Sequence, residues 1–246
     1  MKKLLLTVLT AAAAAASAPA LSSTTDIAFT SFNADEKGWS LVTFADIASN
    51  TTIFFTDNEW NGSAWNSGEG FQVWNSGTNN IAAGTVIRFS SVQNAGRSAS
   101  IGTLSTAGGG LDISATADTV YAYLGTAANA PTTFLSAISS GTFGNATDGY
   151  LTGTGLSVGA GAVQLQNSTD YAEYTGVRSG YTSFAAYKSG VSNAANWSMG
   201  GNGTFATTVP NTTSFSVTAV PEPETYAMLL AGLGLMAAVA RRRKSA

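Results

Sequence analysis

The run Thr52-Ile53-Phe54-Phe55-Thr56 sets β-branched and aromatic residues side by side in a stretch of chain that is otherwise rich in small polar residues. Residues of this kind favour extended backbone, because their side chains pack well on a pleated surface. Five residues is the length of a strand and is too short for a typical helix. The lack of polar alternation predicts that this strand is buried on both faces.

Similar short runs lie on both sides of it, and most of them alternate apolar and polar residues. The predicted strands cover residues 26–32, 39–44, 70–74, 85–89, 119–124, 162–166 and 213–217. Helical periodicity is nearly absent before the C-terminal tail, and residues 132–139 are the one ambiguous piece. Many short strands separated by turn residues predict an all-β fold, a single antiparallel β-sandwich with long loops.

The predicted sandwich occupies residues 21–219. Residues 126–212 contain fewer strand signals than residues 21–125 and have Gly, Ser and Asn throughout. We expect one domain with long loops, and two subdomains are the alternative. The chain has no cysteine, so the hydrophobic core must hold this body together, and its length allows a sufficient core.

The body is acidic, although the whole chain is close to neutral. It holds twelve Asp and Glu against five Lys and Arg, because six of the eleven basic residues lie in the two terminal segments. A body with this balance is a poor candidate for nucleic-acid binding. The charge favours solubility and contact with cations.

The N-terminus has the pattern of a secretory signal. Met1-Lys2-Lys3 precedes a short run rich in leucine and alanine, and Ala18-Pro19-Ala20 supplies small residues where a signal peptidase would cut. We expect residues 1–20 to be a signal peptide removed after Ala20. A retained N-terminal anchor is the alternative.

Residues 220–246 form a tail of three parts: a short polar motif, an uncharged run at 226–240, and a basic cluster. The run of fifteen residues would span about 22 Å as a helix, less than the roughly 20 residues that usually cross a bilayer. Arginine side chains can snorkel and the bilayer can thin, so we predict a short transmembrane helix at 226–240. The basic cluster would stop transfer and stay in the cytoplasm. The alternative, a buried C-terminal helix, would show a polar face.

The tail closely resembles the PEP-CTERM sorting signal of Gram-negative bacteria. The resemblance rests on the motif Pro221, Glu222 and Pro223, the apolar run, and the membrane stop at Arg241, Arg242, Arg243 and Lys244, in this order at the end of the chain. It implies export, transient anchoring in the inner membrane, and recognition of the motif by an exosortase, a membrane-embedded cysteine transpeptidase. It also implies a final place at the cell surface or in an exopolysaccharide matrix.

The body carries a second resemblance, which bears on the fold alone. Residues 54–60, followed by residues 81–87, have the strand-turn-strand rhythm of lamin-tail-like immunoglobulin sandwiches. This resemblance covers about 70 residues and brings no catalytic motif.

The chain has no histidine, which excludes Ser-His-Asp and Cys-His catalysis and the usual zinc sites. No Gly-x-x-x-x-Gly-Lys phosphate loop is present. Paired carboxylates could still serve a glycan hydrolase, and Asp57, Glu59 and Glu69 are the nearest such group along the chain.

The same acidic stretch alternates oxygen ligands ahead of a glycine, as short calcium loops do. The predicted ligands of a calcium site, the one cofactor the sequence suggests, are Asp57, Glu59, Asn61 and Glu69. The loop departs from the EF-hand pattern, because Gly68 stands where that pattern places its last glutamate. The preferred reading is a solvated hairpin turn in which Asn61-Gly62 supplies positive φ.

Tryptophans followed by Asn recur in this region. Trp60, Trp65 and Trp74 could stack on sugar rings beside polar side chains that bind hydroxyls. Tryptophans at strand ends more often serve as buried plugs of the core, and both readings stay open. Together these patterns favour a non-enzymatic surface or matrix protein. A carbohydrate- or calcium-binding module is the second hypothesis, and a glycan hydrolase the third.

Overall fold

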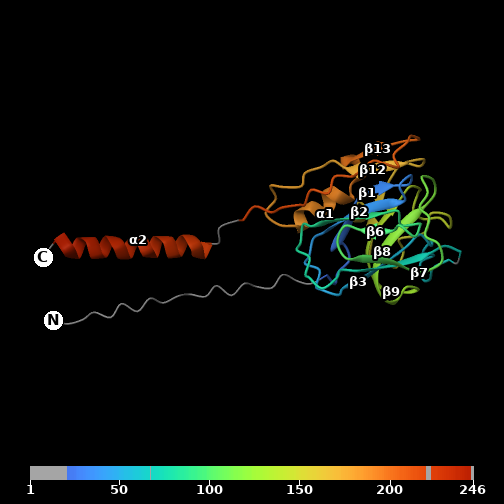
Figure 1. The fold of residues 1–246 in the computed structure, drawn as a ribbon. Helices are drawn as coiled ribbons and strands as arrows, with labels where there is room; N and C mark the ends of the chain where they lie inside the picture. Colours follow the sequence, from blue (N-terminus) through green and yellow to red (C-terminus); the bar gives the residue numbers. More distant parts are fainter. Residues whose placement is uncertain (1–20, 67, 220–222, 245–246) are drawn as a thin grey trace.

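The computed structural model describes residues 21–66, 68–219 and 223–244 (Figure 1). The predicted signal peptide at 1–20 lies outside the described residues, and so do Pro221 and Glu222 of the predicted sorting motif.

Two β-sheets make up the body. The first has the strand order β13 (Trp197–Gly200), β12 (Tyr171–Tyr174), β1 (Ile27–Asn33), β2 (Gly38–Thr43), β5 (Val86–Ser90) and β6 (Ser98–Ala99). The second has the order β10 (Ser157–Val158), β11 (Gly161–Gln164), β9 (Ala130–Ser139), β8 (Thr119–Ala127), β3 (Thr52–Thr56), β4 (Phe71–Asn75) and β7 (Thr103–Gly108). The described helices are α1 (Ala185–Ser192), a 3₁₀ turn at Ala194–Asn196, and α2 (Pro223–Lys244). The predicted all-β sandwich is confirmed at this level.

The sheets are not wholly antiparallel, which corrects the prediction. β11 pairs with β9 in parallel, with Ala162 opposite Ala137, and the short β10 pairs in parallel with β11. Parallel neighbours need a long crossover, and residues 140–160 supply it, returning the chain so that β11 runs alongside the last residues of β9. All the other strand pairs between named strands in the described residues are antiparallel.

Burial of the strands also differs from the prediction. Every residue of β1 and β2 is buried, because these strands occupy the middle of the six-stranded sheet and β1 also packs against β9 and α1. In β3, which we predicted to be buried on both faces, Phe54 is only half-buried. Its ring lies on the outer face of the second sheet and stacks on Tyr123 at 5.7 Å between centroids.

Two stretches have a secondary structure that differs from the one expected from the sequence. Residues 132–139, ambiguous in the sequence, belong to β9. Residues 213–217, predicted as a strand, form no ladder and make one isolated bridge, from Val217 to Tyr181. Phe215 is nevertheless buried there and donates its backbone N–H to the Gly84 carbonyl at 2.7 Å.

The apolar residues gather in two clusters. The main core fills the space between the sheets, with Trp39, Phe55, Phe89 and Trp74 in ring contact at 5.0–6.0 Å. A second group, which we call the outer aromatic cluster, contains Trp60, Trp65, Tyr121, Tyr123 and Phe134. It lies on the opposite face of the seven-stranded sheet, since Tyr121 and Tyr123 alternate along β8 with residues of the main core.

Candidate functional site

The predicted calcium loop follows β3, and its first residue points into the protein. Asp57 is 1% exposed and accepts the backbone N–H of Gly70 at 3.0 Å and that of Asp112 at 2.6 Å. Burial raises the pKa of Asp57 to about 6, although these hydrogen bonds act in the opposite sense. Both carboxylate oxygens therefore tie two loops together, which leaves them poorly placed for a ligand.

The other predicted ligands do not gather around a common point. The Asn61 side-chain oxygen closes its own turn by accepting the N–H groups of Ser63 and Ala64, both at 3.0 Å. Glu59 is half-buried and Glu69 is exposed. Within the described residues, no group of three acidic side chains is placed to hold a metal ion. The geometry supports the hairpin-turn reading of this stretch.

Two further carboxyls share the electrostatics of this loop, although neither was predicted from the sequence. Asp118 is 9% exposed, accepts the Ser114 N–H at 2.5 Å, and has a pKa raised to about 7, first of all by burial. Asp112 is exposed and pairs with Lys37 at 2.8 Å. The sequence pattern did not indicate Asp112 or Asp118, because they lie more than fifty residues after Asp57.

The pKa of Glu69 is also raised, by desolvation of its carboxyl and then by the negative charges of Asp57 and Glu59. Because this residue is exposed, solvent screens those charges, and they act on Glu69 more weakly than they would on a buried carboxyl.

The three tryptophans do not form a platform for sugar rings. Trp74 is fully buried in the main core and donates Nε1–H to the Ile101 carbonyl at 2.8 Å, so it drops out of the predicted sugar-binding set. Trp60 is 7% exposed and donates Nε1–H to the Thr152 carbonyl at 2.9 Å. Trp65 is half-buried, with its ring 5.0 Å from that of Trp60. Trp60 and Trp65 both pack within the outer aromatic cluster.

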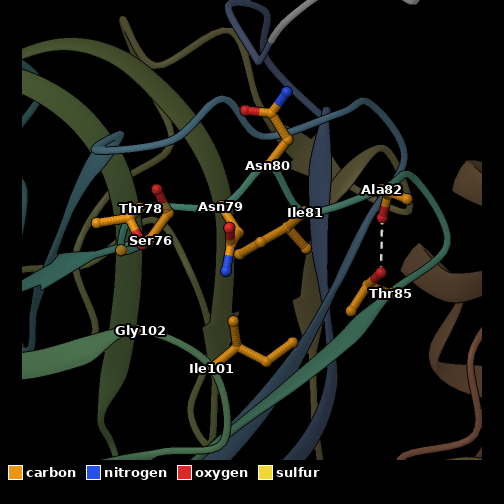
Figure 2. Close-up of a pocket in the computed structure, with 10 residues that line it drawn as sticks. Ser76, Thr78, Asn79, Asn80, Ile81, Ala82, Thr85, Ile101 and Gly102 are labelled. Atoms are coloured by element: carbon orange, nitrogen blue, oxygen red, sulfur yellow. Dashed lines mark hydrogen bonds between the residues drawn. The ribbon is translucent and has the colours of Figure 1, made fainter.

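A pocket of about 430 Å³ lies beside the loop before β5, and Figure 2 shows its lining. The lining residues are Ser76, Gly77, Thr78, Asn79, Asn80, Ile81, Ala82, Thr85, Ile101 and Gly102, none of them charged. Several of the polar groups are already engaged. Asn80 accepts the Ser49 N–H at 2.9 Å, and Thr85 donates to the Ala82 carbonyl at 2.7 Å, the dashed line in Figure 2. They hold their own loop and offer no acid or base.

A groove of about 440 Å³ runs over the outer aromatic cluster. It is lined by Phe143, Gly144, Tyr150, Leu151, Thr152, Leu156, Ser157 and Val158. The Trp60 loop fixes one wall, because Tyr150 donates its backbone N–H to the Trp60 carbonyl at 2.8 Å. Phe143 and Tyr150 are half-buried, so each keeps part of its side chain open to the groove.

Residues 203–218 connect the body to the tail, and several contacts hold this segment against the body. Phe205 stacks on Tyr171, and the Asp35 carboxylate accepts the Phe205 N–H at 2.7 Å. Tyr187 of α1 donates its hydroxyl to the Ser216 carbonyl at 2.6 Å. Within the part of the chain that the structure describes, the last hydrogen bond before α2 that joins this segment to the body runs from the Thr218 N–H to the Tyr181 carbonyl at 2.8 Å.

The tail itself folds as α2, which extends the predicted helix at both ends to Pro223 and Lys244. Its large apolar side chains are 50–70% exposed, namely Met228, Leu229, Leu230, Leu233, Leu235, Met236 and Val239. Adjacent positions such as 228, 229 and 230 point in different directions around a helix, so the helix is apolar on more than one face. Figure 1 shows α2 standing away from both sheets.

Comparison with protein families assigns residues 219–244 to one description, the PEP-CTERM protein-sorting motif. The chain carries a PEP-CTERM sorting tail. No curated protein and no solved structure matched the chain, so the lamin-tail resemblance of the body is not confirmed.

The PEP-CTERM tail implies a protein exported in a Gram-negative bacterium and addressed to an exosortase. Within the described residues, no helix combines the length and the apolar character needed to cross a membrane. The transmembrane helix predicted at 226–240 is therefore not confirmed. Of the tail residues singled out in the sequence, Pro223 begins α2 and Arg241 to Lys244 form its last turn.

Proposed function

We propose that this chain is a cell-surface or exopolysaccharide-matrix protein without catalytic activity of its own. Signal peptidase removes residues 1–20 during export. The PEP-CTERM tail then holds the protein at the inner membrane, until an exosortase that recognises Pro221, Glu222 and Pro223 cuts it and releases the body outward.

The observation that carries the proposal is the exposure of α2. A monomeric soluble protein rarely leaves a contiguous apolar surface of this kind in water. The sandwich has its own filled core and does not cover the helix, so lipid or a membrane protein is the partner that the surface fits. The uncharged run is short for a bilayer, and a marginal span suits an anchor that is held only until processing.

The chemistry of the body supports a role without catalysis. The sequence has neither histidine nor cysteine. The buried carboxyls of Asp57 and Asp118 accept backbone N–H groups and so serve the packing of loops. Nothing in the uncharged pocket beside the loop before β5 offers an acid, a base or a nucleophile activated by one.

Mass spectrometry of the mature protein tests the sorting step. In a Gram-negative host with an exosortase, we expect the natural chain to lose the residues beyond the motif. The triple variant Pro221→Ala, Glu222→Ala, Pro223→Ala should keep the tail through Lys244 and stay in the membrane fraction. Pro131→Ala, a proline outside the motif, is the matched control and should be processed normally. A natural chain that keeps Arg241–Lys244 in that host would contradict the proposal.

A second candidate function is glycan binding in the groove lined by Phe143 and Tyr150. Half-exposed aromatic side chains beside hydroxyl groups suit the apolar faces and hydroxyls of sugar rings. An exopolysaccharide is the glycan that the tail would bring within reach.

Pull-down on purified exopolysaccharide, with and without a calcium chelator, tests this candidate. Binding should fall at least several-fold in Tyr150→Ala and stay unchanged in the control Tyr181→Ala. Loss of binding with chelator alone would point to a calcium-dependent site elsewhere. Equal binding by Tyr150→Ala and the natural chain would remove the groove from consideration.

A further inference from the structure

We infer that one end of the sandwich, where the tail leaves it, lies on the surface of the membrane that holds the tail. This end, called the exit face below, is formed by the exposed side chains of Val177, Tyr181 and Val217 and by the groove beside them. The inference rests on the proposed function, since it needs α2 to be held in a lipid bilayer.

The connection between the body and α2 is short. The body is fixed as far as Thr218, whose N–H is bonded to the Tyr181 carbonyl, and α2 begins at Pro223. Five Cα–Cα steps cover at most about 18 Å even when fully extended. The polar layer on each side of a bilayer core is itself several ångströms thick. A helix entering lipid near Pro223 therefore keeps the exit face close to the headgroups, within the reach of this short connection.

The N-terminus of the described body lies beside the same groove. Leu21, the first described residue, donates its backbone N–H to the Asp46 carbonyl at 3.0 Å. Asp46 lines the same groove as Val217. The predicted signal segment and the sorting tail thus leave from one end of the sandwich, so both attachments favour the same orientation during export.

The exit face is largely apolar. Val177, Tyr181 and Val217 are 54%, 43% and 38% exposed. The adjoining groove has a volume of about 520 Å³, and Phe44, Ala83 and Phe184 are among its lining residues. Its one charged member, Asp46, already accepts the Ala83 N–H at 2.9 Å. Valine, phenylalanine and tyrosine side chains suit the boundary between headgroups and acyl chains.

The opposite end of the sandwich differs in position and in chemistry. It carries the turn between β1 and β2, with Asp35 and Glu36, and the exposed loop around Ala95. β1 alone, at about 3.3 Å per residue, places the two ends roughly 20 Å apart. A probe at Ala95 should therefore stay clear of lipid if the exit face lies on the membrane.

The absence of cysteine from the natural chain makes single-cysteine labelling direct. The full chain would carry Thr182→Cys on the exit face or Ala95→Cys at the opposite end, each with a fluorescent label. Both would be reconstituted into vesicles of phosphatidylethanolamine and phosphatidylglycerol that contain a nitroxide headgroup lipid. Flotation of the chain with the vesicles shows that the tail has bound lipid. Quenching of the label shows how close the labelled position lies to the headgroups.

Among chains that float with the vesicles, we expect quenching at Thr182→Cys at least threefold stronger than at Ala95→Cys. Adding Val177→Asp should reduce quenching at position 182 about twofold or more without changing flotation. The matched control Val209→Asp, at a valine that is also exposed but lies beside the opposite end, should change neither. Equal quenching at positions 182 and 95 in floating chains would overturn the inference and leave the sorting tail standing. Failure of the natural chain to float would overturn both.

Discussion

β1 and the uncharged run of α2 are both rich in apolar and small residues, yet their surroundings are opposite. All seven residues of β1 are buried, whereas the large apolar side chains of α2 are at least half exposed. β1 lies between β2 and β12 and packs against the second sheet, while α2 packs on neither sheet. Apolar composition thus shows that a segment needs a partner, and the fold decides whether that partner is the protein itself or something outside it.

The largest effect should come from placing charge in α2. Leu230→Lys together with Leu233→Lys should cost about 5–7 kcal/mol of membrane insertion, because each charge near a helix centre costs about 2.5–3.5 kcal/mol. Vesicle flotation should be lost while the free energy of unfolding of the body stays unchanged. Retained flotation would show that α2 is held by something other than lipid.

The converse experiment damages the core and spares the tail. Trp74→Ala should lower the free energy of unfolding by about 3–5 kcal/mol, measured by urea denaturation of the full chain in mild detergent. Flotation should persist. Trp65→Ala is the comparison variant and should cost less, because that ring is half-buried in the outer cluster. A larger cost for Trp65 than for Trp74 would reverse our ranking of the two clusters.

A change of pH should act on the body alone. The folded-state pKa values of Asp57 and Asp118, about 6 and about 7, lie above the ordinary value of 3.8. Between pH 4 and 7 the folded chain therefore binds protons that the unfolded chain has released. The free energy of unfolding should rise as the pH falls from 7 towards 4, on the order of 1 kcal/mol per pH unit.

Asp118→Asn provides the control for that slope, since it keeps an oxygen that can accept the Ser114 N–H. Its denaturation curves should show a weaker dependence on pH than those of the natural chain. A natural chain that becomes less stable between pH 7 and 5 would contradict the assignment.

The smallest effect belongs to the predicted calcium loop. Asn61→Ala should cost about 1 kcal/mol of stability, because it removes the acceptor that closes the turn. Asn79→Ala, also an exposed loop asparagine, should cost less. The thermal midpoint of the natural chain should be unchanged by millimolar calcium. A rise with calcium that Asn61→Ala abolishes would restore Asn61 as a ligand.

Short-range patterns predicted much of the fold. Runs of β-branched and aromatic residues marked seven of the strands near their observed bounds, and the order of polar motif, apolar run and basic cluster marked the tail. Weaker patterns failed. β12 and β13 lie in the polar second half, and α1 has only Tyr187 and Val191 as a buried apolar pair. Residues 213–217 alternate like a strand but bond to loops instead of a sheet edge.

The candidate site shows even more clearly that local sequence does not determine where a side chain lies. Asp57, Glu59, Asn61 and Glu69 are close in sequence, yet the fold aims Asp57 inward and leaves Asn61 at a turn. Trp65 and Trp74 have the same local sequence, Trp-Asn-Ser-Gly, yet they lie in different clusters. Side-chain direction depends on strand register and on loops that are distant in sequence, so spacing along the chain cannot fix it.

The sequence by itself determined that this chain carries a sorting tail, because such a tail is recognised as a linear segment whose charge and apolar order need no folded partner. The tertiary structure alone decided which acidic and aromatic residues are used in packing, and from which end of the sandwich the tail leaves. Those are relations between residues far apart in the chain, and they come into being only when the two sheets close on a common core.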